Sequence, residues 1–483
     1  MTTTNTQLIL EAAHQAWNRM APVRERRRRH TRYTYGDQWG DPVTLRDGRR
    51  VSEGEQVAMA GRPPLTNNLI RRLVKSVVGR FRQDYANNQA SSTGTPAPDG
   101  IHPSTRRMNR LDELDARTLE EFLISGMAIH YVCAETRPAG TGIWVDNVPP
   151  DRFFVNAVAD PRCNDMELTG RLLDMSMAEI VMRFSPGNRR LASRLRQLYA
   201  SLSDSNAATS YAEPHARETA FHHAPAGRCR VIEVWTLECR EMLRVHDRME
   251  AVYSIVPASE EGALRRLAAR RKRLGLPGVE FSPWMQSAWH GRFLAPDGTL
   301  LGERPSPFPD GTCPLAVKMY PMIDGEVHSL VEDVIDQQRY VNRLITTMDH
   351  MMGTAAKGVL LFPVQSKVEG MRWEDVARMW ADPGGVIPYR PSGNALPQQV
   401  VTPMADIGAR DLLQTQIKLF EDVSGVGQAL MGKSVSAAVG VERYESEVRN
   451  AAASISDLME TYRDFLSTRN NLIVGLSNAC SEC

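Results

Sequence analysis

The sequence predicts an α+β protein that is predominantly helical. Several stretches carry apolar residues at helical spacing, and the longest of them runs from Glu326 to Gly353. Short alternating stretches, such as residues 231–237, are typical of half-buried strands in an antiparallel sheet. The 42% hydrophobic and 24% charged residues are those of a folded globular protein. The chain of 483 residues is long enough for about two to four domains.

The charges almost cancel, since 58 basic and 57 acidic residues leave a net charge of +1. Any contact with nucleic acid must therefore be local. The seven cysteines are scattered and odd in number, which favours free thiols, and the terminal pair Cys480 and Cys483 has no second pair at zinc spacing. We expect no transmembrane helix and no secretory signal, because no apolar run approaches about 18 residues and the N-terminus lacks a basic segment followed by an apolar one.

The first part of the chain is expected to form helices with basic faces. A short helix is predicted at Gln7–Arg19, and the basic run Arg24–Arg29 follows it. Such a run indicates either a solvated helix end or a phosphate contact. A strongly amphipathic helix begins near Leu69 behind a Thr/Asn cap. Its polar face carries Arg71, Arg72, Lys75, Arg80 and Arg82.

Helices, strands and loops alternate up to residue 325. The Ser/Thr/Pro/Gly-rich segment Asn87–Gly100 predicts a loop, and a helix is expected over Leu111–His130. The low apolar content of Ser201–Gly227 predicts a mobile or extended insertion. Further helices are expected at Met177–Phe184 and, with a basic face, at Gly262–Gly275. Strands are expected at Ile143–Val145, Arg152–Val155, Val231–Leu237, Met249–Ile255 and Trp289–Leu300.

The stretch Glu326–Gly353 predicts one amphipathic helix about 40 Å long, with Gly353 as its C-terminal stop. Its polar side is rich in Asp, Gln and Asn rather than in alternating Glu and Lys, which favours a helix that lines something over an ordinary core helix. Asp333 and Asp336 fall on nearly one face. We interpret them as an acidic lining rather than as ligands of a cation.

A small αβ module is expected between this helix and a returning helix capped by Asp406. The module would contain a strand at Gly358–Pro363, a short helix at Met371–Ala381 and a second strand at Gly385–Tyr389, as in a βαβ unit. It resembles a tip carried on a paired stalk. A Gly/Ala-rich span and a last helix, Glu442–Leu476, would complete the chain.

One motif indicates a possible catalytic site. Gly427–Ser434 matches the phosphate-binding pattern G-x-x-x-x-G-K-[ST], in which Lys433 would reach the phosphates and Ser434 a magnesium ion. The pattern requires a buried strand before it, whereas Gln414–Val423 has helical spacing. We therefore favour a hinge between two helices and keep a site for NTP hydrolysis as the alternative. The pair His222 and His223 is expected at the surface, and we predict no enzyme activity, cofactor or metal.

Four segments, taken in order, carry a resemblance to a known family: Tyr35–Trp39, Leu65–Ile70 with its helix, Val148–Val155, and Leu330–Gln338 followed by Asn342. The chain resembles the portal proteins, or head-to-tail connectors, of tailed double-stranded DNA bacteriophages, and most of all those of short-tailed phages. The resemblance implies a ring, typically of about twelve subunits, at one capsid vertex. It implies a conduit for DNA packaging and ejection that contacts double-stranded DNA independently of sequence.

The resemblance also implies partners and parts. The partners would be the terminase large subunit, then a head-tail adaptor, with the major capsid and scaffolding proteins; the ring would belong to the virion after assembly in the host cytoplasm. No segment after Leu476 is long enough for a helical barrel. The parts would be a wing (1–325), a first stem helix (326–352), a clip (353–405), a second stem helix (406–424), a tunnel loop (425–440) and a wing or short crown segment (441–483).

These parts suggest site residues. The candidates for the DNA channel are Gln428, Lys433 and Ser434 in the tunnel loop, and those for contact with terminase or adaptor are Lys357, Lys367, Trp373 and Trp380 in the clip. Asp333 and Asp336 are the acidic stem candidates. Two alternatives stay open: an NTP-hydrolysing packaging protein that uses Gly427–Ser434, and a helical scaffold unrelated to viruses.

Overall fold

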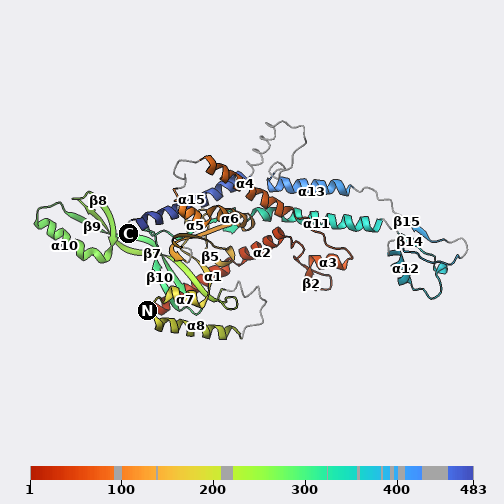
Figure 1. Ribbon diagram of the computed structural model, residues 1–483, viewed down its shortest axis with the longest axis horizontal. Helices are drawn as coiled ribbons and strands as arrows, with labels where there is room; N and C mark the ends of the chain where they lie inside the picture. The colour runs from red at the N-terminus through yellow and green to blue at the C-terminus, as the bar shows by residue number, and fades with distance from the viewer. Residues whose placement is uncertain are drawn as a thin grey trace. The chain divides into compact units, whose positions relative to one another are not determined.

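A computed structural model of the chain describes residues 2–91, 100–137, 140–207, 221–323, 325–355, 359–381, 385–391, 396–400, 408–426 and 455–481 (Figure 1). The chain forms two compact units. Unit 1 contains Met1–Arg29, Val78–Ser329 and Ser456–Cys483, and unit 2 contains His30–Val77 and Leu330–Ile455. Helices and antiparallel strands both contribute, so the fold is a mixed α+β fold, as predicted.

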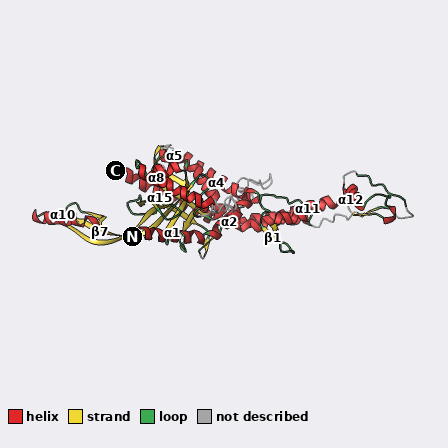
Figure 2. Ribbon diagram, turned by 90° about the horizontal axis from the view of Figure 1, so that it is seen from below, coloured by secondary structure: helices red, strands yellow, loops and turns green. Residues whose placement is uncertain are grey.

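The main sheet of unit 1 has six strands in the order β10-β9-β7-β6-β5, with β8 paired to β7, and every pairing is antiparallel. The predicted antiparallel sheet is confirmed. Two of its strands are much longer than predicted, and their ribbon continues beyond the sheet beside a helix (Figure 2). The strands are β5 (Phe153–Val155), β6 (Leu168–Met175), β7 (Cys229–Asp247), β8 (Val252–Pro257), β9 (Val279–Leu294) and β10 (Leu300–Pro305).

A second sheet of unit 1 joins β11 (Leu315–Met319), β3 (Met127–Arg137) and β4 (Gly140–Asn147). The helix before it, α6 (Leu111–Ser125), ends at Gly126, whose φ of 74° is left-handed. The predicted helix over Leu111–His130 is therefore too long. Residues 127–133 are all buried, so their continuous apolar run lacks the alternation that would identify a strand.

The main hydrophobic core lies between the sheets and α1 (Thr2–Arg19). Full burial of a large apolar side chain stabilises a fold by about 1.5–3 kcal/mol. The core therefore stabilises unit 1 substantially. Its most completely buried large side chains include Tyr131, Phe153, Phe154, Ile232, Trp235 and Leu294.

The helix α15 (Ser456–Ser481) packs on β3 and β11 of unit 1. The predicted last helix, Glu442–Leu476, is described only from residue 455, and α15 extends past its predicted end. Its buried face includes Tyr462, Phe465, Ile473 and Leu476.

In the described residues, the other α-helices of unit 1 are α5 (Pro103–Asn109), α7 (Met177–Phe184), α8 (Arg189–Ala207) and α10 (Glu261–Arg273). The helices predicted at Met177–Phe184 and Gly262–Gly275 are confirmed by α7 and α10. The insertion predicted at Ser201–Gly227 is wrong in its first part, because α8 extends to Ala207 and buries Leu195 and Tyr199 against the sheet. Residues 208–220 lie outside the described chain.

Two helices, α2 (Ala21–Tyr35) and α4 (Leu69–Ser91), run from one unit into the other. The loop predicted from Asn87 is wrong at its start, because α4 continues to Ser91. Within unit 2 the other elements are β1 (Pro42–Thr44), β2 (Arg50–Ser52), α3 (Glu53–Met59), α11 (Leu330–Ala355), α13 (Ala409–Ser424) and the small module described below.

The long predicted helix corresponds to α11, with different ends. It begins at Leu330 because Glu326–Val327 forms β13, which pairs with β12 (Met322–Ile323). It also continues through Gly353 to Ala355. The helix α13 packs along α11 and begins after Gly408, whose φ is 64°; the predicted cap Asp406 lies outside the described residues.

The small module after α11 is built differently from the βαβ unit predicted. Its strands β14 (Val359–Leu361) and β15 (Gln398–Val400) pair antiparallel, and the helix α12 (Trp373–Ala381) lies between them in sequence. The segment Gly385–Tyr389 is not a strand. Pro388 explains this, because a proline cannot donate a ladder hydrogen bond.

Candidate functional site

The side chains Gln338, Asn342 and Thr346 form a stripe along α11, since they are four residues apart. They bind the backbone of Leu65–Ile70. Gln338 Oε1 accepts hydrogen bonds from the backbone N–H groups of Leu69 (2.9 Å) and Ile70 (3.3 Å), and Gln338 Nε2 donates to the carbonyl of Asn67 (2.7 Å). We call this set of contacts the amide joint.

The amide joint satisfies groups that a helix start leaves unpaired. The first N–H groups of α4 have no partner within the helix, and Gln338 supplies one for two of them. Asn342 extends the joint: its Oδ1 accepts from the N–H of Asn67 (3.0 Å), and its Nδ2 donates to Gln38 Oε1 (2.6 Å). Thr346 Oγ1 accepts from the N–H of Leu65 (3.1 Å). The joint thereby fixes the start of α4.

A second contact on α11 is ionic. The carboxylate of Glu53, at the start of α3, is only 4% exposed. Its oxygens accept from Arg339 Nη2 (2.9 Å) and Arg343 Nη2 (2.5 Å). Buried carboxylates are stable when charged groups and hydrogen bonds surround them, and two guanidinium groups meet that need here.

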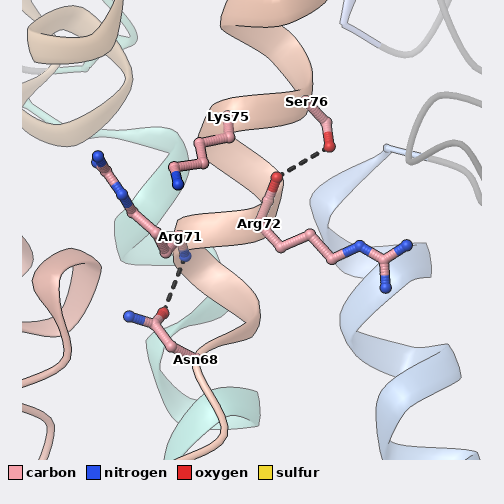
Figure 3. A pocket seen from close by; sticks show the side chains of 5 residues that line it. All are labelled: Asn68, Arg71, Arg72, Lys75 and Ser76. Carbon is pink, nitrogen blue, oxygen red and sulfur yellow. Dashed lines mark hydrogen bonds between the residues drawn. The ribbon is translucent and has the colours of Figure 1, made fainter.

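The start of α4 carries a cationic surface. A hollow of about 450 Å³ is lined by Asn68, Arg71, Arg72, Lys75 and Ser76, none of which is acidic. Arg71 and Lys75 extend to one side of the helix and Arg72 to the other (Figure 3). We call this the basic hollow.

Local contacts set the geometry of the basic hollow. Asn68 Oδ1 accepts from the N–H of Arg71 (2.9 Å), and the Arg71 guanidinium lies 4.4 Å from the centre of the Tyr35 ring. Lys75 and Arg72 are exposed. Cations on an exposed face attract anions, and phosphate and carboxylate groups are the anions that arginine forks bind with two hydrogen bonds. The sequence showed these residues only as the polar face of a helix, and their spacing was the available signal.

The predicted acidic stem residues, Asp333 and Asp336, are both exposed on α11. The side chain of Asp336 is 87% exposed, and its nearest cation is Arg339 at 3.8 Å. The polar side of α11 is therefore not a single surface. Its amides are buried in the joint, whereas these two carboxylates are not.

The predicted clip residues that the structure describes lie on and beside α12. Lys367 Nζ is 5.1 Å from the centre of the Trp373 ring, and Phe362 meets the same ring edge-on. Trp373 is 44% exposed, Trp380 is half-buried and Val376 is buried. The structure thus brings Lys367 and Trp373 together. The fourth candidate, Lys357, lies outside the described residues.

The predicted tunnel-loop residues Gln428, Lys433 and Ser434 also lie outside the described residues, together with the whole Gly427–Ser434 match.

The basic run Arg24–Arg29 in α2 is not simply a solvated helix end, because Arg24 is buried and Arg27 is half-buried. The phosphate contact stays a prediction. The Arg24 guanidinium lies 3.6 Å from the centre of the Trp17 ring, and burial lowers its pKa to about 10. Arg27 pairs with Glu121 (2.6 Å) and Asp151 (2.7 Å). These arginines fix the first part of α2 within unit 1.

The described chain offers no metal centre, since none of its His, Cys, Asp or Glu side chains gather in threes suited to an ion. No described helix combines the length and the apolarity that a membrane crossing requires. His222 is half-buried, with Nδ1 3.1 Å from the carbonyl oxygen of Pro296, so it is not the simple surface residue expected.

Comparison with known proteins identifies the family. The model of the phage P22-like portal protein family matches residues 10–467, whereas no curated protein matches the chain. This match does not support the NTP-hydrolysing alternative. Because the match covers nearly the whole sequence, the chain belongs to the phage P22-like portal protein family.

Proposed function

We propose that the chain is the subunit of a ring at one capsid vertex, through which double-stranded DNA is packaged and later ejected. The observation that carries this proposal is the family match over residues 10–467. The role is structural, so we propose no catalytic residue. A ring of about twelve subunits is the expected assembly.

Exposed apolar side chains along α11 and α13 support assembly. A soluble monomer rarely leaves many large apolar groups open on adjacent helices. Here Tyr340, Met352, Leu412, Leu419 and Val423 are 40–60% exposed. In the ring, the helices of neighbouring subunits would pack side by side and cover these faces. The clip offers a comparable surface at Trp373 and Val364, which are 44% and 75% exposed.

We propose that the parts follow the portal pattern. Residues 1–325 would form the wing, 326–352 and 406–424 the stem, 353–405 the clip, 425–440 the tunnel loop and 441–483 the rest of the wing or a short crown. The clip residues Lys357, Lys367, Trp373 and Trp380 would face terminase and then the adaptor. Capsid and scaffolding proteins are the other expected partners.

DNA would be contacted through its phosphates, because passage must not depend on sequence. We propose Gln428, Lys433 and Ser434 as loop contacts, and Asp333 and Asp336 as an acidic lining that limits adhesion. The basic hollow offers a further cationic surface. Reversing two of its charges, in Arg72→Glu/Lys75→Glu, should reduce the salt dependence of duplex binding by about two phosphate contacts. Arg196→Glu, on an exposed face of α8, is the matched control and should leave the salt slope unchanged.

Electron microscopy of the purified chain, with native mass spectrometry, tests the ring. We expect rings with a central hole. Leu412→Asp/Leu419→Asp should shift the population toward monomers, and Met182→Asp, at a position 77% exposed on α7, should not. A wild-type chain that stays monomeric at high concentration would contradict the proposal. Variants that assemble like the wild type would show that the stem faces do not pack in the ring.

A further inference from the structure

The ribbon of β7 and β9 continues beyond the main sheet as an arm, in which β8 and α10 complete a small separate body (Figures 1 and 2). We define the arm as residues 240–288. Because strand residues alternate between faces, the antiparallel register assigns every strand residue of the arm to one of two faces. The two faces differ sharply.

One face of the arm is closed by α10. Leu243, Val245 and Val279 are buried there, and Leu264 of α10 packs on them. Arg271 of α10 fixes the helix from its end, since its Nη1 donates to Asp247 Oδ1 (2.6 Å). This interaction keeps the pKa of Asp247 low, at about 2.

The opposite face is open and apolar. Met242, Arg244 and His246 of β7 point to this face, as do the residues that pair with them on β8 and β9. Two ring contacts confirm the shared face: His246 stacks on Tyr253 at 4.2 Å, and Arg244 lies 5.9 Å from the Trp284 ring. The large apolar groups of this face are Tyr253 (65% exposed), Ile255 (48%) and Trp284 (45%).

A hollow of about 120 Å³ continues the open face at its base. Arg240, Met242, Gln286 and Ala288 line it from the strands, and Pro305, Phe308 and Pro309 are among the residues on the other side. The open face therefore ends in a recess that fits an apolar side chain.

The size of the closed face indicates what would fit on the open one. The helix α10 has 13 residues, about 20 Å of helix, and it covers Leu243, Val245 and Val279 on its side of the sheet. From Arg240 to His246 the open face also extends about 20 Å. In a common layered architecture, helices pack on both faces of a sheet. The arm has a helix on one face only, so one helical layer is missing. A helix of about 13 residues would supply that layer.

Charge indicates the character of that helix. Most basic residues of the arm belong to α10 on the other side, so the strand cations of the open face are Arg240 and Arg244. On the open face, the one carboxylate in the strand register, Glu280, already binds Arg248 (2.6 Å). Arg244 is exposed beside Trp284, and Arg240 lies at the recess. A helix with an apolar stripe flanked by carboxylates would match both the apolar groups and the arginines of the open face.

We propose that the open face of the arm docks an acidic amphipathic helix of a partner protein. This docking completes a three-layer arrangement with α10 on the other side. The apolar groups of the face favour a protein over DNA, because a phosphate backbone leaves Tyr253, Ile255 and Trp284 exposed to water. The proposal does not depend on the size of the ring.

Binding of synthetic peptides to the full-length protein tests the proposal. The test peptide has about 13 residues, with Leu on one stripe and Glu beside it; in a second peptide every Glu is replaced by Lys. Fluorescence anisotropy should show that the Glu peptide binds at least about tenfold more tightly than the Lys peptide. Trp284→Ser should weaken binding of the Glu peptide by about tenfold, and Met182→Ser, the matched control, should not change it.

A charge exchange separates docking from a folding defect. Arg244→Glu should weaken binding of the Glu peptide and strengthen binding of the Lys peptide. A misfolded arm would not show this exchange. Equal affinity for both peptides, or unchanged affinity in Trp284→Ser, would overturn the proposal. Loss of self-assembly in Trp284→Ser alone would assign the face to a second copy, and duplex DNA that competes with the Glu peptide for Arg244 would assign it to nucleic acid. Both outcomes also overturn it.

Discussion

Two helices of 26 residues each, α11 and α15, are fixed within their units by different chemistry. Neutral amides bind α11 to the backbone of Leu65–Ile70, and an ionic contact with Glu53 lies beside them. A buried ion pair binds α15 to α6, with Arg469 Nη1 and Nη2 donating to the two Asp115 oxygens at 2.9 and 3.0 Å. Helices with similar amphipathic patterns can therefore be held by contacts that respond differently to mutation and to pH.

The largest effect is expected from breaking the ion pair. In Arg469→Met the Asp115 carboxylate stays buried without its partner, which costs about 3–5 kcal/mol. The midpoint of urea unfolding, followed by circular dichroism, should fall accordingly. The double variant Asp115→Leu/Arg469→Met should recover much of the loss, because a well-packed apolar pair replaces the charges. A double variant as unstable as the single one would contradict this account.

Removing the side-chain amide of Gln338 should reduce the free energy of unfolding by less than breaking the ion pair does. Gln338→Ala leaves two N–H groups and one carbonyl without their partner, and we expect a loss of about 2 kcal/mol, since water can replace part of the bonding. Hydrogen exchange measured by mass spectrometry should show faster exchange at the start of α4. The adjacent Gln337→Ala is the control, and it should change little. Similar exchange in both variants would show that the amide joint is not what fixes the start of α4.

Acid should distinguish the two helices. His130 lies beside α15, with its ring 4.9 Å from Phe465 and Nε2 2.8 Å from Thr118 Oγ1. Burial, and then the charge of Arg469, hold its pKa well below the usual 6.5. The unfolded chain therefore binds a proton that the folded chain does not, so stability is retained above about pH 6.5 and falls below it.

We expect a loss of about 1 kcal/mol between about pH 7.5 and 5.5 from this group. His130→Gln should flatten that pH dependence, whereas His223→Gln should leave it in place. The amide joint of α11 contains only amides and a hydroxyl. Protection of the start of α4 from hydrogen exchange, relative to the intrinsic rate at each pH, should therefore not follow the same pH dependence. An equal response of both regions to acid would remove the distinction drawn here.

The smallest effect is expected on the exposed side of α11. Asp336→Asn removes a carboxylate that is 87% exposed and 3.8 Å from Arg339, and such surface pairs contribute about 0–1 kcal/mol. The free energy of unfolding should change by less than about 0.5 kcal/mol. A larger loss would mean that the two sides of α11 are not independent.

Much of the secondary structure could be predicted from periodicity. The helices α4, α7 and α10 begin within one residue of their expected starts, because each carries a clear apolar stripe. The predicted helix Leu111–His130 runs into the strand β3 from residue 127, because burial on both faces of a strand removes its alternation. Pro388 was available as a signal against the strand predicted at Gly385–Tyr389.

The sites were harder to predict. The polar stripe of α11 is visible in the sequence, but the partner of Gln338 lies 269 residues away, and no local pattern indicates a contact at that separation. The open face of the arm required the register of three strands, which alternation alone does not supply. The sequence indicates the basic residues of the hollow, but it does not indicate that they line one surface.

The three separate segments that make up unit 1 constrain when it can fold. Residues 456–481 leave the ribosome after the 126 residues from Leu330 to Ile455 that belong to unit 2. Until then Phe122, His130 and the outer face of β3 lack the helix that covers them. A nascent chain therefore carries an apolar surface open to chaperones through the synthesis of unit 2, and unit 1 becomes complete only after translation has passed α15.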